Sequence, residues 1–345
     1  MTTSNYDHHN NNRRAEILYA ELSSHFSSSG RRSGGETFLS EKQARMNKLS
    51  AILDELTTAK KKRDDDGSGR TPIDINASIA IAKKLIEREG GESNEEEDDA
   101  IEKRHFGYSI LQRLLSSSTP TPAARESEEE AMVKNEFMNI ISNELQLTSR
   151  GGSKVPYPLK SKVAQITAEF IKREGSTAWI AFSETIARML RSTDAYECEL
   201  GAIIARYVAE DVALHSDEVF ADNVRDLLGG MTQTIGEVTR AMREAWERHF
   251  SSSSNNNNNF ASLEMQKASE NCALAVLEAV SVYAEWAPLV PLVRSGLVDI
   301  CCVALLVRLI LFVPLFSRLF FTSRVLKRKA SRAAGDDTQS FGSTI

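Results

Sequence analysis

The sequence predicts an all-α fold, an α-solenoid of antiparallel helix pairs, and three observations point to it. Apolar residues between positions 159 and 250 recur at steps of three and four, which places them on one face of successive helices. The breaks between these stripes are short, as at Gly175-Ser176-Thr177. No alternation typical of β-strands competes over a useful length. Two-faced helices with short connections bury their apolar faces by stacking side by side, as in a solenoid.

Composition agrees with a helix-rich globular array. The chain has 345 residues, of which 41% are hydrophobic and 26% charged, with few glycines and prolines. The net charge of −6 argues against electrostatic binding of nucleic acid by the whole chain, although a local basic surface stays open. Its four cysteines form no CxxC pair, and no secretory signal opens the sequence. We therefore expect a reducing, intracellular compartment.

Apolar spacing predicts helices along most of the chain. Within the central stretch the four stripes begin at Leu159, Trp179, Tyr196 and Val224. Further helices are expected over Glu41–Arg63, Ile73–Glu89, Ala100–Leu115, Glu128–Leu147, Ser262–Trp286 and Leu292–Val307. Low-complexity loops are expected at 90–99, 116–127 and 251–259. The expected organisation is a polar, disordered segment over 1–40, a repeat array over 41–307 and an apolar then basic tail over 308–345.

Two short segments in the first 63 residues can each be interpreted in two ways, as an ordinary solvated or helix-terminal segment or as a functional one. His8 and His9 fit a solvated tail better than a metal site, because no partner ligands surround them in the sequence. A short helix is expected near Ala15 to Leu22. The basic run at 60–63 fits cations at a helix C-terminus, with a nuclear-localisation patch as the alternative.

Four segments, in this order, resemble one protein family. They are Arg104-His105-Phe106-Gly107 followed by Ile110-Leu111; Glu169 to Glu174 with Trp179 five residues later; Ala209-Glu210-Asp211-Val212; and Asn271-Cys272 with Tyr283 and Trp286. Together they resemble the N-terminal portion of the exportin-5 (Hasty) family, in the importin-β (karyopherin) superfamily. The resemblance runs from about Ala100 to Leu306. It departs from the family at Gly175, where a Trp is usual, and in the Ser/Pro/Glu loop at 116–130, which replaces an Arg/Trp-rich segment.

The resemblance implies a HEAT-type (armadillo-like) nuclear export receptor without catalytic activity, shuttling between nucleus and cytoplasm. Its implied partners are GTP-bound Ran, nucleoporins, and structured small RNA (microRNA precursors, tRNA) or protein cargo. The resemblance does not identify the Ran-contacting residues. The signature positions, for which a mostly structural role is expected, are His105, Phe106, Gly107, Lys172, Arg173, Glu174, Trp179, Glu210, Asp211, Tyr283 and Trp286.

Catalytic motifs are missing from the sequence. It contains no P-loop, no HExxH and no Gly-x-Ser-x-Gly elbow. His105 fits a packed or surface histidine better than a general base, and Glu210-Asp211 fits contact with a neighbouring repeat better than acid–base work. Lys172 and Arg173 could contact phosphates, although a solvated helix face is the commoner setting. We expect no enzyme, no catalytic residue, no metal and no cofactor.

The stretch from Leu297 to Phe321 raises an alternative. It is long enough to cross a bilayer, which needs roughly 20 residues. It contains Asp299, Arg308 and Arg318, however, and such charges cost about 2.5–3.5 kcal/mol each near the centre of a membrane helix. Insertion is therefore not favoured. The alternative to an export receptor is a membrane-anchored or soluble HEAT-repeat adaptor that does not bind Ran.

Overall fold

The computed structural model describes residues 13, 15–24, 26, 37–57, 74–87, 97–117, 127–151, 155–213, 221–252, 260–300 and 302. It divides into two units, Met1–Ser295 and Gly296–Ile345. The described residues are helical apart from short turns and contain no strand, which confirms the all-α prediction.

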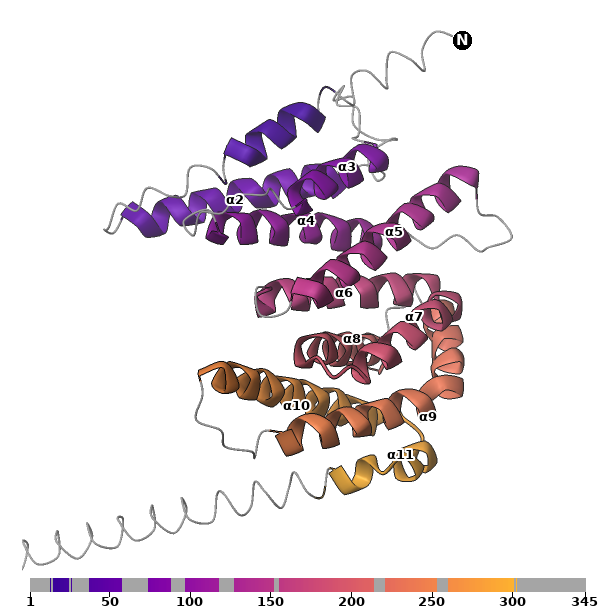
Figure 1. The fold of residues 1–345 in the computed structure, drawn as a ribbon. Helices are drawn as coiled ribbons and strands as arrows, with labels where there is room; N and C mark the ends of the chain where they lie inside the picture. The colour runs from indigo at the N-terminus through magenta and orange to yellow at the C-terminus, as the bar shows by residue number, and fades with distance from the viewer. Residues whose placement is uncertain are drawn as a thin grey trace, which may run out of the picture. The chain divides into compact units, whose positions relative to one another are not determined.

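Ten helices of the first unit carry labels in Figure 1. They are α2 (Thr37–Thr57), α3 (Ile75–Ile86), α4 (Glu97–Ser117), α5 (Glu128–Gly151), α6 (Tyr157–Glu174), α7 (Ser176–Leu190), α8 (Ala195–Ala213), α9 (Ala221–Ser252), α10 (Phe260–Trp286) and α11 (Leu289–Ser295).

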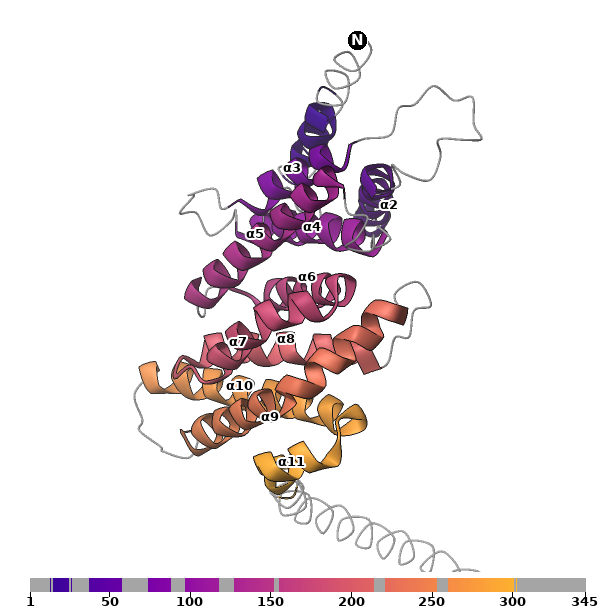
Figure 2. The same ribbon diagram turned by 90° about the vertical axis from the view of Figure 1, so that its right-hand side faces the viewer.

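The helices of this unit pack in two rows. In one row α2 packs on α4, α4 on α6, α6 on α8 and α8 on α10. In the other, α7 packs on α9 and α9 on α11. The rows are joined by the pairs α3–α4, α5–α6, α7–α8 and α9–α10, and Figures 1 and 2 show these pairs in successive layers. This arrangement is the α-solenoid of helix pairs that the sequence predicts.

Local sequence signals explain where several helices begin. The Asp74 side chain accepts a hydrogen bond from the Asn76 amide (3.3 Å) at the start of α3. At the start of α5, the Ser127 hydroxyl accepts from the Glu130 amide (3.2 Å), and the Glu130 carboxylate accepts from the Ser127 amide (3.1 Å). That reciprocal pair is a capping box, which satisfies two backbone donors left free by the helix end.

Gly175 separates α6 from α7 and has a positive φ of 71°. Its amide donates to the Ile171 carbonyl (2.8 Å), which ends α6, and α7 begins at the next residue. A side chain is strained in this region of φ, because Cβ clashes with the backbone, whereas glycine enters it freely. The departure from the family pattern at this position therefore has a backbone reason.

The apolar stripes form the core. Leu159, Val163, Ile166 and Phe170 are each no more than 2% exposed, and Phe170 meets Phe182 of α7 edge to face. Some apolar residues that fit the helical period are instead exposed. Met46, Met132 and Leu263 are 55%, 72% and 63% exposed, respectively. The apolar period predicts which face of its helix a residue occupies. It does not predict how much of that face a neighbouring helix covers.

The C-terminal end of the described array differs from the prediction of one helix over Leu292–Val307. Pro291 lies inside α11, in its first turn, where the missing amide of proline is tolerated. The helix ends at Ser295 because Gly296 follows with a φ of 77°. Residues 297–300 are helical again, while 301 and 303–345 lie outside the described part, as does most of the Leu297–Phe321 segment. Among the described helices, none combines the length and apolarity required to span a bilayer.

The N-terminal 40 residues include a described helix over 15–24. Its Leu18 and Leu22 are buried, and Glu21 pairs with Lys48 of α2 at 2.7 Å. The short helix expected near Ala15 is therefore present and packed. His8, His9, the basic run at 60–63 and most residues of the three expected low-complexity loops lie outside the described residues.

Candidate functional site

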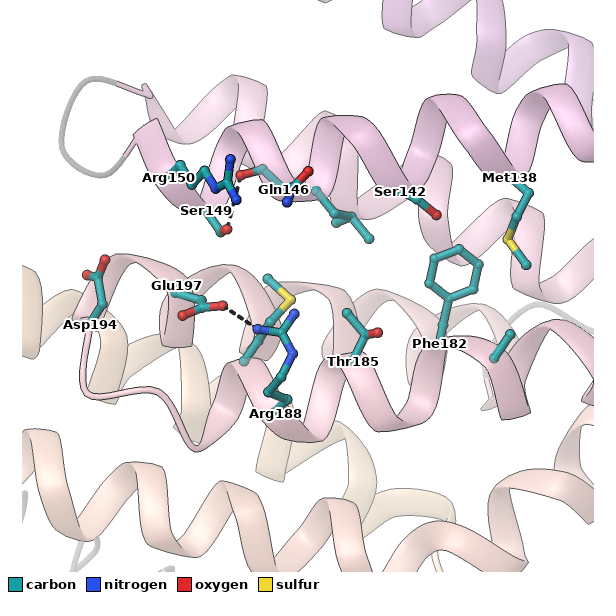
Figure 3. Close-up of a pocket in the computed structure, with 13 residues that line it drawn as sticks. Met138, Ser142, Gln146, Ser149, Arg150, Phe182, Thr185, Arg188, Asp194 and Glu197 are labelled. Carbon is teal, nitrogen blue, oxygen red and sulfur yellow. Dashed lines mark hydrogen bonds and ion pairs between the residues drawn. The ribbon is translucent and has the colours of Figure 1, made fainter.

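A groove lies between α5 and α7, with a volume of about 580 Å³. Both helices pack on α6 and α8, so they lie side by side and the groove runs between them. Its lining is Met138, Ser142, Leu145, Gln146, Ser149, Arg150, Ala181, Phe182, Thr185, Arg188, Met189, Asp194 and Glu197. Figure 3 shows the α5 side chains facing those of α7 and of the start of α8.

The groove has an apolar floor and a polar rim. Leu145, Phe182 and Met189 are each no more than 5% exposed and form the floor. On the rim, the Arg188 guanidinium donates to the Glu197 carboxylate at 3.1 Å, an interaction drawn in Figure 3. The rim thus carries hydroxyl groups, an amide and paired charges around an apolar floor. Such a surface suits the binding of a peptide or protein, because protein–protein interfaces usually have an apolar centre and a polar rim. Sequence reasoning missed this groove, because no motif marks residues that a gap between two helices brings together.

His105, Phe106 and Gly107 lie on α4. A Cβ on Gly107 would lie 2.9 Å from Ile86 Cγ1 and 3.0 Å from the Ala82 carbonyl oxygen, so glycine lets α3 and α4 approach closely. Phe106 contacts the Phe26 ring (6.0 Å between centroids). Half-burial, and secondarily the charge of Lys162, lower the pKa of His105, which favours the neutral imidazole.

Beside this segment lies a buried polar cluster that sequence reasoning missed. The Tyr108 hydroxyl donates to the Glu144 carboxylate at 2.6 Å, and the Arg104 guanidinium donates to the Tyr108 hydroxyl at 3.0 Å. Burial, followed by the charge of Glu144, raises the pKa of Tyr108 well above its ordinary value. These groups join α4 to α5 through hydrogen bonds, which buried polar side chains require.

Lys172 does not fit either interpretation considered from the sequence, phosphate contact or a solvated helix face. It is only 5% exposed, because this turn of α6 faces the interior of the array. Arg173 pairs with Glu174 at 3.2 Å, and Glu174 also pairs with Lys134 of α5 at 2.8 Å. The Lys-Arg-Glu segment thus lies within the packing of α5 and α6.

Trp179, near the start of α7, is 1% exposed. Its indole Nε1 donates to the Thr234 hydroxyl of α9 at 2.7 Å. The ring therefore lies between two consecutive helices of one row, with its single polar atom satisfied.

The remaining signature positions lie on α8 and α10. Glu210 pairs with Arg206 at 3.3 Å, and Arg206 also pairs with Glu278 of α10. Tyr283 is buried, and its ring lies 5.3 Å from that of Trp286. Asp211 follows Glu210 at the end of α8. The signature positions are spread over α4, α6, α7, α8 and α10, and the structure does not gather them into one site.

Two comparisons with known proteins find similarity over part of the chain. Residues 156–310, which include α6 to α11, match the family model described as exportin 1-like protein. The chain is also similar to Protein HASTY 1 of Arabidopsis thaliana, with 30% identity over 145 residues. That alignment covers 42% of this chain and 12% of the relative. No solved structure matches the chain.

These matches confirm the resemblance to the exportin-5 (Hasty) family over part of the chain. Lys172 to Trp179, Glu210, Asp211, Tyr283 and Trp286 lie within the exportin 1-like domain, whereas His105 to Gly107 precede it. The domain is of the HEAT type, in agreement with the two rows of helices.

Proposed function

We propose that this chain acts as a karyopherin-type nuclear export receptor, binding GTP-bound Ran together with cargo. The observation that carries the proposal is the exportin 1-like domain over residues 156–310, supported by the stacked helix pairs. In the proposed mechanism Ran-GTP and cargo favour the same curvature of the array, so each strengthens binding of the other. Hydrolysis of GTP on Ran then releases both in the cytoplasm. Nucleoporin contacts and shuttling between nucleus and cytoplasm belong to the same proposal.

The surface charges favour a protein partner over RNA in the described part of the chain. Several partly exposed cations there are already paired with carboxylates: Lys83–Glu136, Arg113–Asp54, Arg188–Glu197 and Arg243–Glu247. A paired cation contributes less to phosphate binding, which depends on releasing counterions from the nucleic acid. Ran and protein cargo are therefore the first partners to test, and structured small RNA is the second.

The proposal is tested by retention of Ran on the immobilised chain. Ran loaded with a non-hydrolysable GTP analogue should be retained, and Ran-GDP much less. Because the match covers 12% of the relative, we expect weak binding, since affinity depends on a few anchors and not on area alone. Equal retention of the two forms would contradict the proposal, because an export receptor distinguishes them. Retention of neither form would leave a HEAT-repeat adaptor without Ran binding.

A second arm asks whether the α5–α7 groove takes part. Ser142→Trp would fill the groove from α5, while Asn139→Trp places the same ring on an exposed position of that helix outside the groove lining. Retention weakened only by Ser142→Trp assigns the groove to the interface. If both variants retain Ran equally, Ran does not bind in the groove. A labelled hairpin RNA, titrated at several salt concentrations, tests the RNA cargo.

A further inference from the structure

Two cysteines and a histidine from three helices meet in the core of the array. Cys198 lies on α8, His249 near the end of α9 and Cys272 on α10. The two Sγ atoms and a ring nitrogen of His249 all lie within 4.8 Å of one another. Their residues are 0%, 3% and 0% exposed, respectively. No spacing in the sequence marks this cluster, since packing alone brings the three positions together.

His249 is the most informative member of the cluster. Its Nε2 is buried and has no hydrogen-bond partner within the described part of the chain. A buried polar atom normally has a partner, because leaving it unpaired costs about 1–3 kcal/mol. A ligand that accepts the nitrogen lone pair would remove this cost.

We propose that Cys198, His249 and Cys272 form a binding site for Zn²⁺. Thiolate sulfur and imidazole nitrogen are the ligands that this ion prefers. Zinc–sulfur bonds of about 2.3 Å in tetrahedral geometry place two sulfurs roughly 3.8 Å apart. The three donor atoms lie within 4.8 Å of one another, so they would need to move only slightly closer together to bind one ion. The fourth position would take water or the Leu190 carbonyl oxygen, which lies 3.3 Å from Cys198 Sγ.

The surroundings suit two thiolates. The Cys198 thiol donates to the Leu190 carbonyl, a bond that a thiolate gives up, but Arg248 donates to the same oxygen at 3.5 Å and to the Ser192 carbonyl at 3.0 Å. The cation of Arg248 thus lies close to the sulfurs. A bound Zn²⁺ would offset the negative charge of the two thiolates, together with the nearby Arg248 cation.

Zinc bound here would tie together three helices that are consecutive in the chain. α8 packs on α10, and α10 on α9, so the metal would reinforce contacts already present. Metal ligation contributes directly to folding stability when the ligands are dispersed in the unfolded chain. The site is thus a structural clamp within the exportin 1-like domain, and it does not depend on the proposed transport function.

The experiment measures metal in the full chain, purified under reducing conditions. We expect about one equivalent of zinc per chain by elemental mass spectrometry. Replacement by Co²⁺ should give the sulfur-to-cobalt charge-transfer band and the strong d–d bands of a tetrahedral thiolate site. Cys272→Ala and His249→Gln should lose most of both signals. The exposed Cys302 provides the matched control, and Cys302→Ser should keep them.

A second measurement separates loss of metal from loss of fold. A chelator should lower the melting temperature of the unsubstituted chain and of Cys302→Ser, but should leave that of Cys272→Ala unchanged. Three results would overturn the proposal: no zinc and no tetrahedral cobalt spectrum in the reduced chain, metal signals that persist in Cys272→Ala, or a Cys198–Cys272 disulfide found by mass spectrometry with no metal bound after its reduction.

Discussion

At the scale of single residues, two glycines occupy positions where a larger residue would be strained or would clash. Gly175 supplies the positive φ that lets α7 follow α6 without a longer connection. Gly107 lets α4 approach α3 so closely that an added Cβ would meet three neighbouring atoms at 2.9–3.1 Å. The conformational cost of glycine in a helix is therefore offset by packing at Gly107.

We predict that Gly107→Ala destabilises the chain by about 1–2 kcal/mol, because overpacking against the Ala82 backbone outweighs the better helix propensity of alanine. Urea denaturation followed by circular dichroism measures the change. Gly229→Ala is the control, since a Cβ there meets nothing within 4 Å. That exposed substitution on α9 should stabilise by roughly 0.5–1 kcal/mol. Equal changes in both variants would contradict the close approach of α3 and α4.

At the scale of the helices, buried side chains anchor two of the neighbouring pairs. Lys160 of α6 and Glu199 of α8 form a 2.7 Å ion pair, with side chains only 5% and 8% exposed. Lys160 also lies over the Tyr196 ring, 4.9 Å from its centroid. Trp179 joins α7 to α9 through its ring and its indole hydrogen bond. Each row of the array thus has one such anchor between two of its consecutive helices.

Breaking the buried ion pair should be costly. Lys160→Met keeps much of the aliphatic volume but leaves Glu199 buried without its cation, which typically costs about 3–5 kcal/mol. Arg243→Met on α9 removes one member of a pair whose side chains are about half exposed, and should cost about 0.2–1 kcal/mol. Chemical denaturation of the two variants, compared with the unsubstituted chain, measures the difference. Similar losses would show that the Lys160–Glu199 pair is hydrated.

Removing the indole ring of Trp179 should also lower the free energy of unfolding. Trp179→Ala is expected to cost about 3–5 kcal/mol, because it leaves a cavity between α7 and α9 and removes the partner of the Thr234 hydroxyl. Ile180→Ala is the neighbouring control, since Ile180 is 62% exposed and should change stability little. A denaturation midpoint unaffected by Trp179→Ala would mean that the ring is not an anchor.

At the scale of the whole molecule, the array is built from interactions between neighbours. Each helix pair contacts mainly the next, so no single centre collects the family's signature positions. A chain of this kind presents extended surfaces, and the groove between α5 and α7 is one of them. The proposed binding of Ran and the proposed zinc clamp rest on different observations, a family match and a cluster of three side chains, and can fail independently.

The sequence by itself predicted most of the helices and the family resemblance. The apolar period predicted the stripes of α6 to α9, and the order of short segments such as Lys172-Arg173-Glu174 indicated the exportin-5 (Hasty) resemblance. These features are local, since they depend on residues within a few turns of one another. The burial of Lys172 was not predictable in the same way, because the face of a helix that is covered depends on its neighbours.

Only the tertiary structure decided which distant residues meet. The groove depends on how α6 and α8 place α5 beside α7, and the Tyr108–Glu144 hydrogen bond joins α4 to α5 across 36 positions of the chain. Cys198, His249 and Cys272 share no motif, because three separate helices supply one ligand atom each. The physical reason is that periodicity fixes the direction of a side chain on its own helix, whereas the distance between side chains on different helices is set by packing.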